Sequence, residues 1–230
     1  MHLETLLIDF DGTLASTNYF YYKPQLRCAS IIIQALKHDS IDPGKLIARA
    51  DDLRKESIAD GWKSRYHFEN SWIDLYRELC LKTGHKPKNT VEKRLFAAAE
   101  KYRTHNEYRL FPGVPEALRT IKQRKILCTL GHVDIQTRKI EMTGLDKLLD
   151  DIEIVAFKNI ATYKGLLAKY KLDPATTAMI GDNTRLDIAP AMDCNIMTFH
   201  ILGKHQAPFI TGMPLKYQTL HTFAEVLSYL

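Results

Sequence analysis

The sequence of 230 residues has few cysteines and no long apolar run, and each shortage excludes a class of protein. The four cysteines, at 28, 80, 128 and 194, stand far apart and form no Cys-x-x-Cys pair, which argues against a disulfide framework or a zinc site. No segment approaches the roughly 18 apolar residues that a membrane span requires. The acidic residue Glu4 comes before any apolar segment long enough for an export signal. We expect a soluble cytoplasmic protein with no membrane partner.

The charge is ordinary in amount but uneven in distribution. Charged residues make up 26% and hydrophobic residues 45%, as in a globular protein with a sizeable core. Residues 15–110 carry 18 Lys and Arg against 12 Asp and Glu, which accounts for the excess of positive charge in the chain. The signs alternate, as in residues 51–56, so this is no basic block for nucleic acid. A solvated helical surface that weakly attracts small anions fits better.

Two aspartates follow the first apolar segment. Leu3 to Ile8 has the pattern of a strand buried on both faces. Asp9 and Asp11 are two residues apart, so on an extended backbone their side chains leave the same face, at the carboxyl end of the strand. Gly12 permits a sharp turn there. Converging carboxylates repel each other unless a cation lies between them, so the pair indicates a metal site.

A second pair of aspartates follows a later strand. Residues 177–180 have the pattern of a buried strand, and Gly181-Asp182 comes next, with Asp187 five residues further on, across a turn into a helix. Carboxylate oxygens are ligands that Mg2+ prefers. Asp182 is placed to bind such an ion directly. Asp187 is placed to hold a metal-bound water or to orient a neighbouring lysine.

The secondary-structure pattern changes near residue 110. Before it we expect a loop at 15–22 and then four helices without strands, in the manner of a helical bundle; after it, helices and strands alternate, which indicates a doubly wound parallel sheet. The expected helices of the first part are 25–38, 45–59, 66–83 and 89–103. Those of the second part are 115–121, 133–142, 160–170, 186–192 and 223–230, with strands at 125–130, 152–157, 177–180 and 196–201.

Four motifs together resemble those of the haloacid dehalogenase-like (HAD) hydrolase superfamily. The stretch from Asp9 to Leu14 resembles the first motif, and Thr129, at the end of a strand, resembles the second. Lys158, directly after a strand, resembles the third, with Lys164 in the next helix as a competing candidate. Gly181-Asp182 followed by Asp187 resembles the fourth. Leu130 and Asn159 stand where many relatives have Asn and Pro.

This resemblance implies a Rossmann-like catalytic core over residues 1–14 and 111–230, with a four-helix cap at 15–110. Asp9 would be the nucleophile that forms an aspartyl-phosphate, and Asp11 the general acid and base. Mg2+ would be held by the carboxylates of Asp9 and Asp182 and by the backbone carbonyl of Asp11. The phosphoryl group would be bound by Thr129, Lys158 and the amides of Leu130 and Gly131. Thr13 and Asp187 would contact the residues that bind the metal and the phosphoryl group, and would not themselves bind either directly.

Three functions fit these residues. The first is a Mg2+-dependent phosphatase that hydrolyses a small phosphorylated metabolite, and the second is a phosphomutase with the same catalytic residues. The third is a phosphate-accepting regulatory module without turnover, which leaves Asp11 and the helical insert unexplained. A dehalogenase is disfavoured because that chemistry needs neither Asp11 nor an acidic metal site at Asp182. Candidates for contacts to the rest of the substrate are Tyr19, Tyr21, Arg49, Arg54, Trp62, Arg65, Tyr66 and His67.

Overall fold

The computed structural model describes residues 2–37, 41–59, 63–203 and 216–230. These form two compact units, each described separately below. The first combines residues 1–17 with 107–230, and the second comprises residues 18–106.

The first unit is built on a parallel sheet of six strands among the described residues, in the order β3-β2-β1-β4-β5-β6. All pairings along this order are parallel, which confirms the predicted fold class. The strands are β1 (Thr5–Ile8), β2 (Arg124–Leu130), β3 (Asp151–Val155), β4 (Thr177–Gly181), β5 (Met197–Ile201) and β6 (Tyr217–Leu220).

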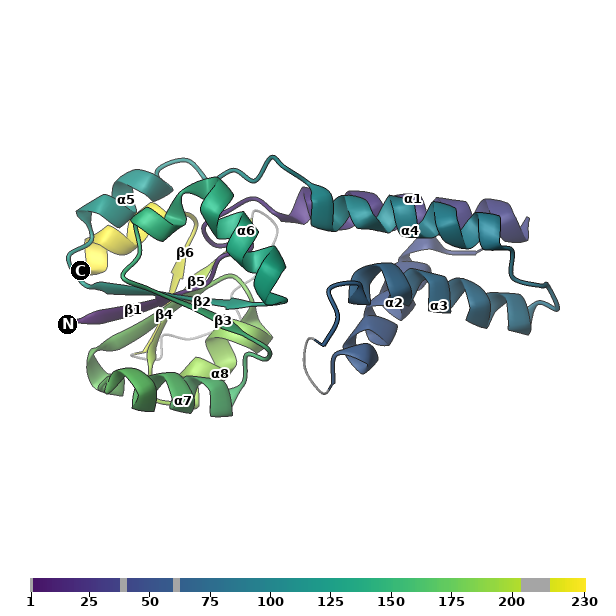
Figure 1. The fold of residues 1–230 in the computed structure, drawn as a ribbon. Helices are drawn as coiled ribbons and strands as arrows, with labels where there is room; N and C mark the ends of the chain where they lie inside the picture. The colour runs from purple at the N-terminus through teal and green to yellow at the C-terminus, as the bar shows by residue number, and fades with distance from the viewer. Residues whose placement is uncertain (1, 38–40, 60–62, 204–215) are drawn as a thin grey trace. The chain divides into compact units, whose positions relative to one another are not determined.

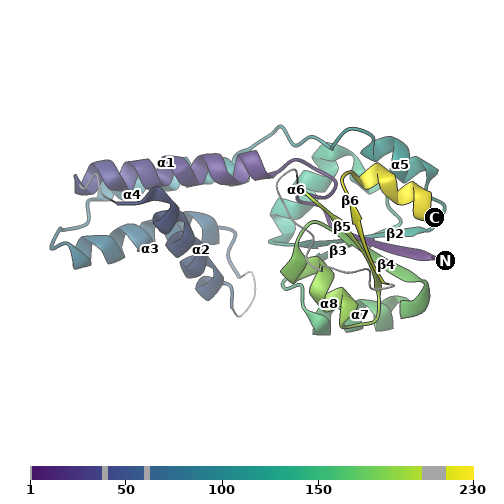
Figure 2. The same ribbon diagram turned by 180° about the vertical axis from the view of Figure 1, so that it is seen from behind.

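Helices cover both faces of this sheet (Figures 1 and 2). α5 (Val114–Thr120), α6 (Val133–Thr143) and the 3-10 helix Phe223–Tyr229 lie on one face, and α7 (Ile160–Tyr170) and α8 (Ala189–Met192) on the other. Alternate residues of a strand point to opposite faces. Leu6 and Ile8 therefore pack with the first group of helices, whereas Leu7 packs beside Tyr163 of α7. Burial on both faces explains why the strands read as unbroken apolar runs.

The central strand places the predicted motifs beside one another. Ile8, the last residue of β1, pairs with Leu127 of β2 on one side and with Ile180 of β4 on the other. β2 and β3 lie on one side of β1, and the later strands β4, β5 and β6 lie on its other side. The direction in which successive strands are added to the sheet therefore reverses at β1. Ligands of open α/β sheets bind outside the carboxyl ends of the strands at such a reversal.

The second unit consists, in its described residues, of four helices around their own apolar core. They are α1 (Asn18–Leu36), α2 (Pro43–Ser57), α3 (His67–Lys82) and α4 (Asn89–Thr104), with α1 and α4 side by side (Figures 1 and 2). Trp72 of α3 is fully buried at the centre of this core. Asp42 caps α2 by accepting a hydrogen bond from the Gly44 amide, and Pro43 occupies the first turn.

The first helix begins earlier than the sequence indicates. The loop expected at 15–22 is wrong, because α1 is helical from Asn18 and contains Pro24. A proline inside a helix removes one hydrogen bond and disfavours the preceding turn. Tertiary contacts outweigh that cost here. Phe20 stacks on His105 with ring centroids 3.4 Å apart, and Tyr21 packs against Phe68.

The chain enters and leaves the insert through two paired segments of the first unit. The Ser16 amide donates to the Arg109 carbonyl, and the Phe111 amide donates to the Leu14 carbonyl. This pairing brings Ala15 and Leu110 opposite each other. The expected boundaries at 15 and 110 therefore fall within the first unit. That the second unit acts as a cap stays a prediction.

Three smaller differences concern the C-terminal half. β6 was not predicted because its four residues include the half-buried Gln218 and Thr219, which break the apolar pattern. The helix expected at 186–192 is a π-helical turn at Thr184–Ile188 followed by the short α8. The terminal helix is a 3-10 helix. Among the described residues, no helix combines the length and the apolar character that crossing a bilayer demands.

Candidate active site

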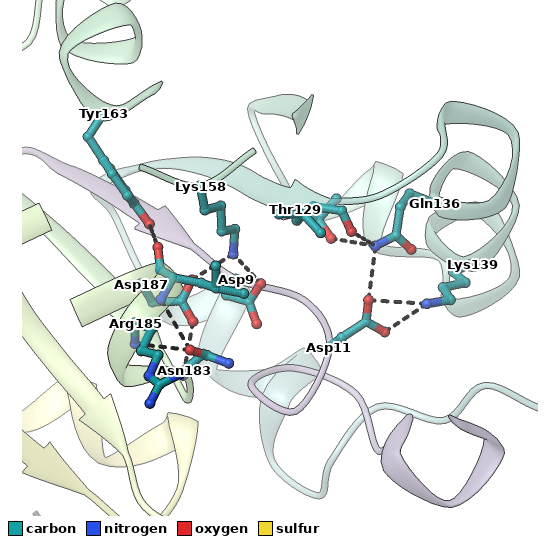
Figure 3. A network of polar contacts seen from close by, with 12 residues as sticks. Asp9, Asp11, Thr129, Gln136, Lys139, Lys158, Tyr163, Asn183, Arg185 and Asp187 are labelled. Carbon is teal, nitrogen blue, oxygen red and sulfur yellow. Dashed lines mark hydrogen bonds and ion pairs between the residues drawn. The ribbon is translucent and has the colours of Figure 1, made fainter. Parts of the chain in front are cut away.

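A buried lysine joins two of the predicted aspartates. Lys158, shortly after β3, places Nζ 2.5 Å from Oδ1 of Asp9 and 2.7 Å from Oδ1 of Asp187 (Figure 3). The side chain of Lys158 is only 2% exposed, so its ammonium is almost wholly shielded from solvent. The competing candidate, Lys164, is exposed on α7. Asn159 has a role of its own here, since its side chain caps α7 by accepting from the Thr162 amide.

The loop after β4 holds Asp187 in place. Its Oδ2 accepts a hydrogen bond from the Asn183 amide at 3.0 Å. The Asn183 side chain in turn accepts from the amides of Arg185 and Leu186 and caps the π-helical turn. Tyr163 of α7 donates its hydroxyl hydrogen to the Leu186 carbonyl. Both carboxylate oxygens of Asp187 are thus engaged by groups of the protein, which suits a residue that orients Lys158.

Two glycines bring the aspartates close together. A Cβ on Gly12, whose φ is +91°, would lie 2.2 Å from Oδ2 of Asp182. A Cβ on Gly181 would lie 2.4 Å from Cβ of Asp187. No side chain fits at either position without moving an aspartate, so both glycines are required for the close approach of the chain.

The backbone of Asp182 is held by a buried histidine of β5. Nε2 of His200 lies 3.2 Å from the Asp182 carbonyl oxygen, and Nδ1 lies 2.9 Å from the Tyr217 hydroxyl. A carbonyl only accepts, so Nε2 carries the hydrogen. Burial lowers the pKa of His200 against the opposing influence of the Asp182 carbonyl and of Asp187, so the ring is neutral and its Nδ1 accepts from Tyr217. These hydrogen bonds, from Tyr217 through His200 to the Asp182 carbonyl, fix the end of β4.

The carboxylates outnumber the positive charge in this cluster. Asp9, Asp182 and Asp187 offer oxygens within 4.8 Å of one another, and one ammonium, that of Lys158, lies among them. Burial raises the pKa of Asp9 well above its usual value, Lys158 opposes the rise, and the neighbouring carboxylates add to it. Burial and Asp187 likewise raise the pKa of Asp182 to about 7, although Lys158 lowers it. The cluster is short of positive charge.

This donor set fits a hard divalent cation. Carboxylate oxygens are the ligands that Mg2+ takes in proteins, and burial together with uncompensated neighbouring carboxylates raises the pKa values of this set. Both oxygens of Asp187 already accept, from Lys158 and from Asn183. Asp9 accepts from Lys158 through Oδ1, so its Oδ2 and the carboxylate of Asp182 are placed to bind the ion.

Asp11 lies in a different environment from Asp9. Its two oxygens are 2.9 and 3.1 Å from Nζ of Lys139, and its Oδ2 also accepts from Nε2 of Gln136 at 2.9 Å. Both partners belong to α6, and Figure 3 shows Asp11 directed toward that helix. Burial by itself would raise the pKa of Asp11. The Lys139 ammonium and hydrogen bonds from Gln136, Lys139 and Thr17 outweigh burial and lower it, so Asp11 is ionised.

The remaining predicted residues lie at the ends of β1 and β2. Thr129 is buried, and its hydroxyl oxygen lies 2.8 Å from Nε2 of Gln136. The amide of Gly131 already donates to the Val155 carbonyl, and the Leu130 carbonyl accepts from Gln136. The hydroxyl of Thr13 is buried with no hydrogen-bond partner within the described part of the chain.

Four residues of the site were not predicted from the sequence. Gln136 and Lys139 stand three apart on α6, so they share the face that also buries Ile140. Polar residues on the buried face of a helix were the signal available for them. Tyr163 and His200 are single polar residues in apolar surroundings. Only the pairing of β4 with β5 shows that His200 stands opposite Gly181, beside Asp182.

Most candidates for substrate contacts in the insert have partners within the second unit. Tyr21 donates to Asp51, Arg49 pairs with Glu56 and Glu78, and Arg54 pairs with Asp51. His67 lies 2.9 Å from the Ser57 hydroxyl and accepts from the Ser64 amide. Arg65 bonds the Tyr66 hydroxyl but is exposed, as is Tyr19. Trp62 lies outside the described residues.

Comparison with known proteins identifies the class to which this fold and site belong. A family model for haloacid dehalogenase-like hydrolases matches residues 3–194. The chain belongs to this family of hydrolases, as the four motifs indicated. A search of curated proteins finds no match.

Solved structures with this fold differ in their chemistry. A haloacid dehalogenase-like family hydrolase from Xanthomonas campestris is 19% identical, with a TM-score of 0.80 over 99% of this chain and 91% of that one. A predicted phosphoglycolate phosphatase from Haemophilus somnus is 16% identical, with a TM-score of 0.64 over 100% and 98%. The 2-haloacid dehalogenase from Pseudomonas syringae is also 16% identical, with a TM-score of 0.63 over 99% of both chains. At these identities the likeness concerns the fold.

Proposed function

We propose that this hydrolase is a Mg2+-dependent phosphatase that acts on a small phosphorylated metabolite through an aspartyl-phosphate. The observation that carries the proposal is the cluster of Asp9, Asp182 and Asp187 around Lys158, which is short of positive charge. A cation and a phosphoryl group together suit such a cluster, because the first offsets the carboxylates and the second is bound by the cation and the ammonium.

The proposed reaction has two steps. Asp11 is ionised in this structure, so it first takes up a proton, from solvent or from the hydrolytic water of the preceding turnover. Asp9 then attacks phosphorus in line, and the bond to the leaving oxygen breaks as that oxygen takes this proton from the Asp11 carboxyl. Asp11, then ionised as it is in this structure, accepts a proton from the water that hydrolyses the aspartyl-phosphate. When bound by the carboxylates of Asp9 and Asp182 and the carbonyl of Asp11, Mg2+ supplies positive charge to the phosphoryl oxygens.

The protein groups that contact the phosphoryl oxygens are fewer than the motifs imply. Lys158 supplies an ammonium beside Asp9, and Thr129 supplies a hydroxyl at the end of β2. The Leu130 amide remains a candidate donor. Because the Gly131 amide donates to Val155, it contributes only if that bond opens. Asp187 and Asn183 keep Lys158 in position.

The acidic residues also separate this proposal from a dehalogenase. Displacement of halide by an aspartate needs no proton donor for the leaving group and no cation. The ionised, tightly bound Asp11 and the crowded Asp182 would then have no function. We further propose that the helical unit is a cap over the site, that the substrate is a small phosphate ester, and that the protein acts in the cytoplasm.

Release of inorganic phosphate tests the proposal. The purified protein, incubated with p-nitrophenyl phosphate or a panel of phosphorylated metabolites, should release phosphate over many turnovers with Mg2+ and not with EDTA. Halide release from a 2-haloacid without added metal would favour the dehalogenase. Stable phosphorylation of Asp9 without turnover would favour a regulatory module. Transfer of the phosphoryl group within a sugar phosphate would favour a mutase.

A further inference from the structure

Helix α6 carries a lysine that is almost completely buried against the site. The side chain of Lys139 is 2% exposed, and an ammonium would be costly to bury there alone. Nζ contacts both oxygens of Asp11 and lies 5.5 Å from the centre of the Tyr108 ring. A lysine buried in this way compensates the Asp11 carboxylate.

Gln136, one turn earlier on α6, ties the same carboxylate to β2. Its Nε2 lies 2.9 Å from Oδ2 of Asp11, 2.8 Å from the Thr129 hydroxyl oxygen and 2.8 Å from the Leu130 carbonyl oxygen. The carbonyl and the carboxylate only accept, which assigns the amide nitrogen to this side. The Asp11 side chain is therefore held from two positions of one rigid helix.

These contacts oppose an attraction that the rest of the site creates. Asp11 is two residues from Asp9, and a bound Mg2+ beside Asp9 and Asp182 would attract any free carboxylate as a further ligand. A carboxylate bound to the metal cannot transfer protons to or from the reacting groups. Figure 3 shows the Asp11 carboxylate on the α6 side, apart from the Asp9–Lys158–Asp187 cluster.

We propose that Lys139 and Gln136 are positioning residues that keep the Asp11 carboxylate off the metal and thereby available for proton transfer. The inference rests on the proposed function for its use of Mg2+ and of Asp11. It is tested first by metal binding, which requires no turnover. Removing the ammonium in Lys139→Met leaves Gln136 as the contact from α6 to Asp11 and loosens the carboxylate. Mg2+ affinity measured by calorimetry should therefore rise about fivefold, since each added carboxylate ligand tightens a cation site.

Two control variants and one double variant show whether that result comes from the release of Asp11. Lys139→Arg keeps the charge and should bind Mg2+ as the wild type does. Lys147→Met removes an exposed lysine just beyond α6 and should also leave the affinity unchanged. Asp11→Asn together with Lys139→Met removes both charges, so it leaves no buried unpaired charge if the single variant folds poorly. In the Asp11→Asn background, the change at Lys139 should have no effect on Mg2+ affinity.

Kinetics separate positioning from a merely structural role. An alkyl phosphate needs a proton on its leaving oxygen, whereas p-nitrophenolate leaves without one. In Lys139→Met, kcat for the alkyl ester should fall about a hundredfold, the scale of lost general acid catalysis, with KM unchanged. The first-turnover burst of p-nitrophenolate should stay within about threefold of the wild-type rate, because formation of the aspartyl-phosphate then needs no proton donor, although steady-state turnover falls since Asp11 also deprotonates the hydrolytic water.

Several results would overturn the inference. One is an unchanged or weaker Mg2+ affinity in Lys139→Met, and another is an equal gain with and without Asp11, which would show a simple loss of nearby charge. A first-turnover burst of p-nitrophenolate slowed as much as kcat for the alkyl ester would overturn it as well. If no phosphate ester turns over but the metal-binding results appear as expected, the proposed function fails and the positioning of Asp11 stands.

Discussion

Asp9 can act as a nucleophile only when it is ionised, and its neighbours determine whether it is. Burial and the carboxylates of Asp187 and Asp182 raise its pKa, and Lys158 alone opposes them among the groups identified here. Burial by itself would lower the pKa of Lys158, but Asp187 and Asp9 raise it well above the usual value, so the ammonium stays charged. A bound cation adds the charge that the nucleophile still lacks.

The substitution Asp9→Asn should abolish turnover and leave the fold intact. It removes the attacking oxygen and relieves the repulsion among the carboxylates, so the melting temperature should not fall. Phosphate release should drop by about a thousandfold or more, as when other covalent nucleophiles are removed. Lys164→Met, a change at an exposed lysine, serves as the control and should keep full activity. Near wild-type phosphate release by a folded Asp9→Asn protein would rule out the mechanism.

Asp182 and Asp187 should differ in their effect on metal binding. Asp182→Ala removes a proposed direct ligand, whereas Asp187→Ala removes the partner of Lys158 and the Asn183 amide. We expect Mg2+ affinity to fall at least about a hundredfold in the first variant and about tenfold or less in the second. Calorimetric titration with Mg2+ measures both. Equal losses in the two variants would contradict this assignment.

Residues in motifs could be predicted from the sequence, and residues that act from other elements could not. Asp9, Asp182 and Lys158 each follow a strand, so a parallel sheet brings them to one edge whatever its other details. Gln136 and Lys139 reach the site only because α6 packs with one particular face inward. That face depends on the packing of the whole core, which no local spacing encodes.

At the scale of elements, the segment from β4 through the π-helical turn determines where Asp187 lies. Gly181 ends β4 with its Cα directly against the Asp187 side chain. The strand, the turn and the caps by Asn183 form a single closely packed unit. Any added atom at Gly181 must therefore be accommodated by moving Asp187 away from Lys158.

The substitution Gly181→Ala tests this packing. The new Cβ would lie 2.4 Å from Cβ of Asp187, so we expect a loss of about 2–3 kcal/mol in the free energy of unfolding, as overpacking typically costs. Gly165→Ala in α7 is the matched control. Nothing lies within 4 Å of its Cβ, so it should stabilise the protein by up to about 1 kcal/mol through helix propensity. Urea unfolding of the two variants measures both effects, and a Gly181→Ala protein as stable as Gly165→Ala would contradict the prediction.

The elements themselves were predictable where one pattern dominated. The apolar strands of the sheet and the helices between them follow from periodicity and from turn residues, because burial on both faces leaves a continuous signal. The start of α1 was not predictable, because contacts of Phe20 and Tyr21 with distant aromatic residues outweigh the local effect of Pro24. β6 is too short and too polar to stand out.

For the whole molecule, stability should depend on pH and Mg2+ together. The folded pKa of Asp182 is raised to about 7, above its usual value of 3.8, and that of Asp9 is raised as well. The folded state therefore keeps protons that the unfolded chain has released. Without Mg2+, the free energy of unfolding should fall as the pH rises through that range.

Unfolding in urea between about pH 5 and pH 8 measures this dependence, because carboxyls with lowered pKa values lose their contribution only at lower pH. The lowered pKa of His200 acts in the opposite sense there, as one group against the two carboxyls of Asp9 and Asp182. Mg2+ binds the ionised carboxylates, so the stability that it adds should increase with pH. Asp182→Asn should remove a large part of the slope seen in EDTA. A metal-free protein that is more stable at pH 8 than at pH 5 would contradict the prediction.

The positive charge of the insert should influence the approach of substrate. Residues 15–110 hold 18 basic and 12 acidic residues, while the site itself is a group of carboxylates that repels anions. We expect kcat/KM for a small dianionic ester to fall as ionic strength rises. Arg65 is exposed, so Arg65→Ala should lessen that dependence and leave Mg2+ affinity unchanged.

Arg54, which like Arg65 is a candidate for substrate contacts from the sequence, provides the contrast. Its guanidinium pairs with Asp51 and bonds the Tyr21 hydroxyl, and its side chain is 18% exposed. Arg54→Ala should therefore destabilise the helical unit and change the salt dependence little. If kcat/KM proves insensitive to salt, the charge of the insert is only a property of its solvated surface.

The pairing of the two segments at the entrance of the insert has a consequence for how this architecture arises. Hydrogen bonds from Ser16 to Arg109 and from Phe111 to Leu14 bring the two ends of the insert together within the sheet unit. Residues 18–106 therefore connect two paired segments of the sheet unit, as the loop of a hairpin connects its two strands. The entropic cost of closing such a loop grows only slowly with its length. In evolutionary terms the junction is an acceptor site. An insert of different length could therefore replace residues 18–106 at little cost in loop-closure entropy to the strands of the sheet.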